Sequence, residues 1–145
     1  MKNQITISKL VVAITLFFTF FPNSNKTFAQ QRGKEYFYVY VSGIFSENQT
    51  SYISQPIYFS SQENCGDIGL WDFRTKAQAA FGIYLQTNYP NAFPYNVKNV
   101  LVLPKQGYQI FRNIQQVNDA LKDWKFDQNY DKYKTAETNF TYSCQ

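Results

Sequence analysis

The strongest β-forming stretch of this chain is YFYVYVSGIF, residues 36–45, an almost unbroken run of aromatic and β-branched side chains. Such residues favour extended backbone because they pack well on a pleated surface. Successive side chains of a strand point to opposite faces, which gives two sets: Tyr36, Tyr38, Tyr40 and Ile44 on one face, and Phe37, Val39, Val41 and Phe45 on the other. Both sets are bulky, so we expect a central strand that is covered on both sides.

A second apolar run, residues 52–60, follows a polar segment of hairpin-loop length at residues 46–50. This arrangement predicts an antiparallel hairpin. Pro56 has no backbone N–H and cannot donate to a sheet ladder. The second strand is therefore expected to be an edge strand or to contain a bulge.

Two helices are predicted farther along the chain. The first ends near Asn88 before Pro90, with Asp72 or Thr75 as its N-cap. The second follows an N-cap at Asn113 and has an apolar stripe that extends to Trp124. A short strand, residues 97–103, separates the two helices.

The end of the chain is interpreted as a charged loop, residues 127–134, followed by a closing strand, residues 138–144, in which apolar and polar side chains alternate. The complete order is β-β-α-β-α-β. This order predicts a single small α+β domain, with a mixed or antiparallel sheet and two helices.

Residues 1–29 have the pattern of a secretory signal peptide, which resembles the leaders of exported bacterial proteins. Basic residues precede an apolar segment, residues 10–21, and Thr27 and Ala29 provide the small side chains of a cleavage site. The apolar segment is shorter than the about 20 residues that a permanent membrane helix needs. We expect an exported domain, residues 30–145, that is periplasmic or secreted and is not stably inserted in a membrane.

The two cysteines, Cys65 and Cys144, both lie in this expected domain. Because an exported protein meets an oxidising environment, they are expected to form a disulfide.

The composition argues against several classes of function. Lys2, Lys9 and Lys26 belong to the leader, so the net charge falls from +4 to about +1 after cleavage. A nearly neutral domain lacks the cationic surface of a nucleic-acid-binding protein. The absence of histidine removes the commonest general base. We expect no cofactor, no metal site and no catalytic residue.

Two carboxylate patterns leave alternatives open. The stretch DQNYD, residues 127–131, resembles the start of a calcium loop, but Lys132 occupies the position of the sharp-turn glycine. Glycoside hydrolysis needs a pair of carboxylates. The two close pairs are Asp67 with Asp72 and Asp119 with Asp123.

Aromatic side chains make up 19% of the residues, more than a core of this size requires. Some of the tyrosines should therefore lie on the surface, either on one face of the first strand or in the later loops. The strand set, Tyr36, Tyr38 and Tyr40, is the candidate binding face, and the loop set is Tyr89, Tyr95, Tyr130 and Tyr133. We interpret the protein as a non-catalytic binding domain, whose partner is a protein or an envelope component such as a glycan. The alternatives are a carboxylate-dependent glycan hydrolase and an inhibitor or immunity-type partner of an exported toxin.

Overall fold

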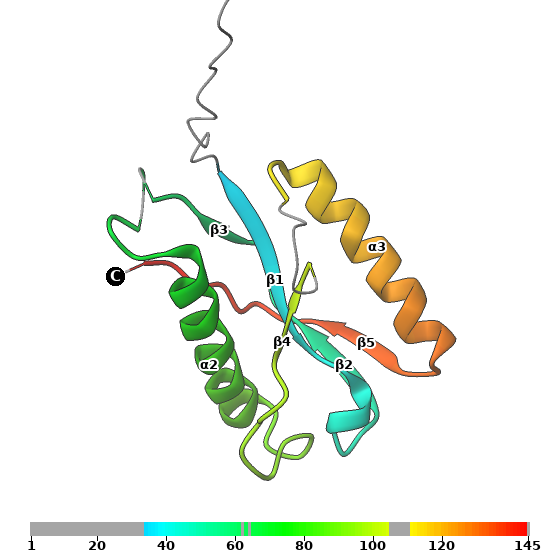
Figure 1. Cartoon of the computed structure of the whole chain (residues 1–145). Helices are drawn as coiled ribbons and strands as arrows, with labels where there is room; N and C mark the ends of the chain where they lie inside the picture. The colour runs from blue at the N-terminus through cyan, green and yellow to red at the C-terminus, as the bar shows by residue number, and fades with distance from the viewer. Residues whose placement is uncertain (1–33, 62, 64, 105–110, 145) are drawn as a thin grey trace, which may run out of the picture. The chain divides into compact units, whose positions relative to one another are not determined.

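The computed structural model describes residues 34–61, 63, 65–104 and 111–144, and shows a mixed five-stranded sheet with two helices (Figure 1). The strands are β1 (Glu35–Val41), β2 (Thr50–Ile53), β3 (Ile57–Phe59), β4 (Leu101–Leu103) and β5 (Lys134–Glu137). The helices are the 3₁₀ turn η1 (Gly43–Phe45) and the α-helices α2 (Leu70–Asn88) and α3 (Ile114–Tyr130). This architecture confirms the α+β prediction, although the expected second strand is divided in two. The expected signal peptide, residues 1–29, lies outside the described residues.

Strand β1 is the centre of the sheet. Its Tyr40 pairs with Ile53 of β2 on one side and with Leu101 of β4 on the other. Strands β2, β3 and β4 all run antiparallel to β1, whereas β5 adds to β2 in parallel. The sheet is therefore mixed because of β5 alone.

The predicted hairpin is confirmed, and its second strand contains a bulge. Tyr40 pairs with Ile53, whereas Phe37 pairs with Ile57, so β2 and β3 together use one residue more than β1 over the same length. The extra residue lies in the segment that contains Ser54 and Pro56. The Ser54 hydroxyl accepts a hydrogen bond from the Val39 N–H at 3.1 Å, which satisfies a ladder donor at the break.

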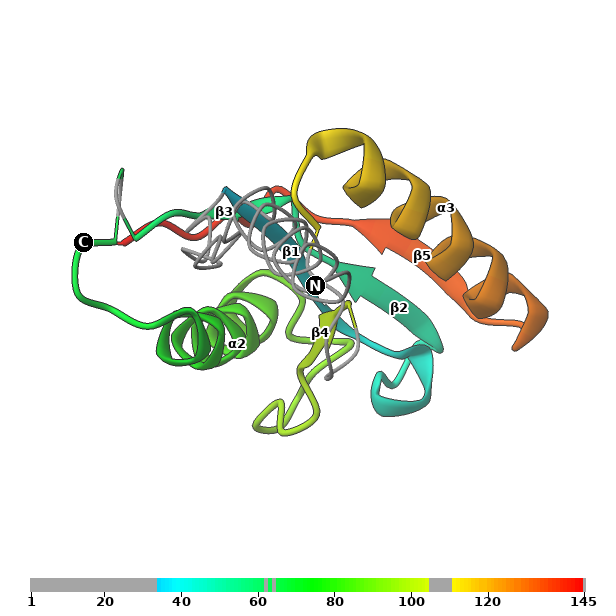
Figure 2. The same ribbon diagram turned by 45° about the horizontal axis from the view of Figure 1, so that its top comes forward.

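The two faces of β1 are covered by different helices, as the alternation of its side chains predicts. Phe37, Val39 and Val41 are fully buried in a core that includes the inner face of α2. Tyr38 and Tyr40 belong to a second core with Val117 and Trp124 of α3. Figure 2 shows α2 and α3 on opposite faces of the sheet. Full burial of one such side chain contributes about 1.5–3 kcal/mol.

Two boundaries in the first half of the chain differ from the predictions. Strand β1 ends at Val41 rather than Phe45, because the chain turns at η1, where the Gly43 N–H donates to the Ser51 hydroxyl at 2.7 Å. Helix α2 begins at Leu70, after Gly69, without a side-chain cap. The predicted caps, Asp72 and Thr75, are instead inside the helix.

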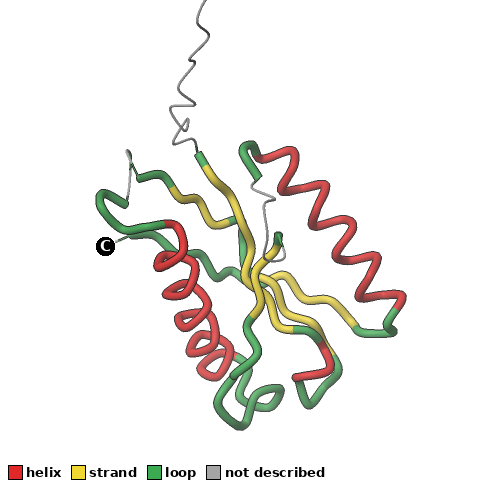
Figure 3. The backbone as a smooth tube through the Cα atoms, viewed as in Figure 1, coloured by secondary structure: helices red, strands yellow, loops and turns green. Residues whose placement is uncertain are grey.

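The end of the chain also differs from the prediction. Helix α3 continues to Tyr130, so much of the expected loop is helical. The closing strand is β5, and residues 138–144 lie outside any strand (Figure 3). Strand pairing stops at Thr138, whose N–H and hydroxyl both donate to the Ile53 carbonyl.

The predicted disulfide between Cys65 and Cys144 is present, with a Cα–Cα distance of 5.1 Å. It joins the end of the described chain to the loop between β3 and α2. Among the described residues, no helix has both the length and the apolar character needed to cross a membrane.

Candidate functional site

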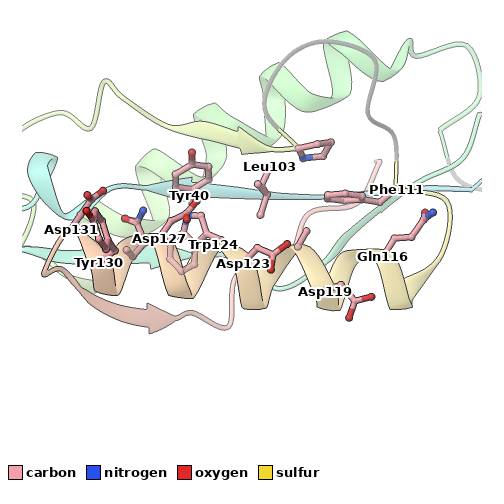
Figure 4. Close-up of a pocket in the computed structure, with 13 residues that line it drawn as sticks. Tyr40, Leu103, Phe111, Gln116, Asp119, Asp123, Trp124, Asp127, Tyr130 and Asp131 are labelled. Carbon is pink, nitrogen blue, oxygen red and sulfur yellow. The ribbon is translucent and has the colours of Figure 1, made fainter.

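An open groove with a volume of about 830 Å³ lies between α3, β1 and the end of β4 (Figure 4). We call it the α3 groove. Two kinds of residue line it. The apolar set is Tyr40, Leu103, Pro104, Phe111 and Trp124, and the acidic set is Asp119, Asp123, Asp127 and Asp131.

The apolar set belongs mainly to the sheet. Leu103 and Tyr40 come from the paired strands β4 and β1, and Phe111 continues the same edge through a bridge to Tyr36. Tyr40 contacts Trp124 of α3 edge-to-face, with ring centroids 5.6 Å apart. These contacts hold an aromatic floor between the helix and the sheet.

Trp124 contributes a polar atom as well as its ring. The residue is 4% exposed, and its indole Nε1 has no hydrogen-bond partner in the described part of the chain. Buried donors are nearly always paired, because an unpaired one costs about 1–3 kcal/mol. The indole N–H is therefore an unsatisfied donor beside the groove.

The alignment of the acidic set follows from helical geometry. The four aspartates are spaced four residues apart, and all are exposed. Four residues turn a helix by about 40° beyond a full turn, so the row winds slowly around α3. It runs from the outer rim at Asp119 toward the sheet at Asp127, as Figure 4 shows.

Cations lie on the other flank of α3. Lys125 pairs with Glu137 of β5, and Lys122 pairs with Asp119 at 3.7 Å. No lysine or arginine lines the groove within the described ranges. The charged residues that line the groove are therefore all aspartates, and Asp119 is the one that is paired with a lysine.

The last turn of α3 is anchored by Gln128, which is buried. Its Oε1 accepts hydrogen bonds from the Ser51 hydroxyl of β2 and, at 3.4 Å, from the Ser42 hydroxyl. This buried network joins the helix to the sheet. It also places Asp127 and Asp131 at one end of the groove.

The two buried tyrosines remain neutral at physiological pH. Burial raises the pKa of Tyr40, and the nearby Asp127 carboxylate raises it further. Burial, with a smaller contribution from Glu137, raises the pKa of Tyr38 to about 12. The charge of the groove therefore comes from the aspartates.

The three tyrosines predicted as a binding face do not form an exposed surface. Tyr38 and Tyr40 are 1% and 4% exposed because α3 covers this face of β1. Tyr36 is half-buried and contacts the ring of Tyr58, with centroids 5.2 Å apart. Exposure was wrongly predicted for Tyr38 and Tyr40, and only Tyr40 reaches the groove.

The two predicted carboxylate pairs lie in different places. Asp119 and Asp123 belong to the groove, whereas Asp67 and Asp72 line a separate depression near the start of α2. The wall opposite Asp119 and Asp123 is apolar. In the described structure, no carboxylate of this groove faces another across it.

The stretch that resembles the start of a calcium loop is helical from Asp127 to Tyr130. In a helix, side chains two residues apart do not face each other, so Asp127 and Asn129 cannot converge on one ion as the loop pattern requires. The part of the chain that the structure describes contains no cluster of three or more potential His, Cys, Asp or Glu ligands.

The sequence interpretation missed Trp124, Asp127 and Asp131 as groove residues. A helix extended into the expected loop, residues 127–134, would have aligned the aspartates, and their spacing of four residues was the available signal. Known proteins give no further guidance. The chain matches no protein-family model, no curated protein and no solved structure.

Proposed function

We propose that the protein is an exported, non-catalytic binding domain, and that the α3 groove holds its ligand, a protein or a component of the cell envelope. The observation that carries this proposal is the groove itself. It combines an aromatic floor, four exposed aspartates and an unpaired indole donor. Binding sites typically join an apolar surface to a few polar groups that orient the ligand.

Export is supported by the leader pattern of residues 1–29 and is consistent with the disulfide. Disulfides persist in oxidising compartments and are rare in the cytosol. We place the protein in the periplasm or outside the cell.

The arrangement of carboxylates favours binding over glycan hydrolysis. A glycosidase uses two carboxyl groups that flank the scissile bond. Here the four groove aspartates all come from α3, and the groove residues of the sheet side, Leu103 and Phe111, are apolar. A sugar ring in the groove would meet acidic groups on one side only.

The test uses the full chain, purified after export with its disulfide intact, as bait for envelope extracts. The groove variant is Asp123→Asn with Asp127→Asn. The matched control is Asp67→Asn with Asp72→Asn, which also removes two exposed carboxylates. We expect one stoichiometric partner that the wild type and the control retain and the groove variant loses.

Three results would contradict parts of this proposal. Cleavage of an envelope polysaccharide, lost in the groove variant, would support the hydrolase alternative. Capture and inactivation of a toxin would support the immunity alternative. A partner that the groove variant retains fully would show that the groove is not the binding site.

A further inference from the structure

We infer that the ligand of the α3 groove is an extended, positively charged polypeptide segment with basic side chains at every second position. This inference rests on the proposed function, because it names the ligand class of the same groove. It draws on three features of the groove: its charge, the spacing of its aspartates and its unpaired indole N–H.

The charge of the groove selects a cation. Four carboxylates line it, and its described lining includes no lysine or arginine. Lys122 pairs with Asp119 at the rim, and Lys125 pairs with Glu137 of β5. Among the described residues, Asp123, Asp127 and Asp131 are therefore left without an ion pair. Complementary charge speeds association and excludes ligands of the wrong sign.

The spacing of the aspartates matches an extended chain. Residues four apart rise about 6 Å along a helix, so the row from Asp119 to Asp131 spans about 18 Å. Alternate residues of an extended strand are about 6.6 Å apart. A strand that follows this slowly winding row can therefore present one basic side chain to each successive aspartate.

The two walls of the groove differ in the same way as the two faces of such a strand. One wall is the acidic flank of α3, and the other is apolar, with Leu103, Pro104 and Phe111. Side chains of a strand alternate between opposite faces. The intervening residues of the ligand would therefore be apolar.

The unpaired indole of Trp124 distinguishes a peptide from a simple polyamine. Its Nε1 is a buried donor without an acceptor among the described residues. Trp124 lines the groove where α3 meets Tyr40 of β1. A peptide carbonyl provides the acceptor that this N–H lacks.

The experiment titrates the full exported chain with three capped hexapeptides. The first has three Lys-Val repeats, the second has three lysines followed by three valines, and the third has three Glu-Val repeats. A neutral chitin oligosaccharide represents the glycan alternative. Binding is measured by calorimetry, and the indole N–H of Trp124 is followed by NMR.

We expect the Lys-Val repeat to bind at least about fivefold more tightly than the block peptide, because only its spacing fits the row. Affinity should fall as salt rises from about 50 mM to about 500 mM. Each groove aspartate changed to Asn should weaken binding by about two- to fivefold. The Asp67→Asn with Asp72→Asn control should bind like the wild type, and the Trp124 indole signal should shift on binding.

Equal binding of the repeat and block peptides, or tighter binding of the acidic peptide or the oligosaccharide, would overturn the inference. An affinity that does not change with salt concentration would also overturn the inference. If no peptide binds but an envelope partner still depends on the groove aspartates, the ligand class is wrong and the proposed function stands. If binding of that partner also does not depend on the groove aspartates, the proposed function fails at this site.

Discussion

Breaking the disulfide between Cys65 and Cys144 should remove most of the stability of this domain. The bond joins residues 79 positions apart. In the chain-entropy description, closing a loop of this length stabilises the folded state by about 4.5 kcal/mol at 25 °C. Small domains have about 5–15 kcal/mol in total. The reduced protein should therefore be close to the limit of folding.

The folded state should lose few contacts when the disulfide is reduced. Cys65 is 5% exposed and belongs to the core under α2, so its side chain remains packed when the bond is reduced. The tail before Cys144 has other contacts with the body. The Gln55 N–H donates to the Phe140 carbonyl at 2.8 Å, and the Phe140 ring lies 5.1 Å from that of Phe81. Reduction should act mainly on the unfolded chain.

The assay is urea unfolding followed by tryptophan fluorescence, for the oxidised wild type, the reduced wild type and Cys144→Ala. With a slope of about 1–3 kcal/mol per M, the midpoint should fall by about 1.5–4.5 M on reduction. Cys144→Ala should match the reduced wild type and should not respond to reductant. A midpoint that moves by less than about 0.5 M would refute the reasoning.

Two further predictions concern buried polar groups. Gln128→Ala removes the acceptor of the buried Ser51 hydroxyl, so the free energy of unfolding should fall by about 1–3 kcal/mol in the same urea assay. An unchanged midpoint would contradict the anchoring role of Gln128. Burial raises the pKa of Glu35 above its ordinary 4.5, against the opposing charges of two arginines. The folded state therefore binds this proton more tightly than the unfolded state, and the stability from Glu35 is complete below pH 4.5 and is lost as pH rises through the raised pKa. The side chain of Glu35→Gln stays neutral, so the urea midpoint of this variant should exceed that of the wild type near pH 7. The difference between the two midpoints should shrink toward about pH 4. A difference that grows toward low pH would show that the arginine charges outweigh burial.

The centre of the fold could be predicted from local pattern alone. The alternating bulky residues of β1 correctly placed one core on each side of the sheet, and Pro56 correctly indicated a break in the partner strand. Asn113 also caps α3 as expected, and its side chain accepts from the Gln116 N–H at 2.9 Å. These features depend on residues close together in the sequence.

The end of α3 could not be predicted in this way. The inward stripe of Val117, Leu121 and Trp124 continues with Gln128, a polar residue. Its position became favourable only because Ser51, 77 positions earlier, supplies a hydrogen bond. A prediction based on apolar periodicity ends the helix near Trp124, so it does not include the last two aspartates of the groove.

The closing strand was misplaced for a related reason. Residues 138–144 alternate more clearly than β5, whose sequence is KTAE. Pairing with β2 decides the position, since Thr50 to Ile53 offer a free edge to residues 134–137. Tertiary context overrides weak strand propensity here.

The parallel pairing of β5 with β2 has a consequence for how the polypeptide is made. A ribosome that has just translated β2 must add about 80 more residues before the partner strand exists. At about 5–20 residues per second, this takes about 4–16 s. During that interval the β2 edge of the sheet lacks its partner strand. Any factor that keeps the chain extended during synthesis therefore acts before the native fold can form.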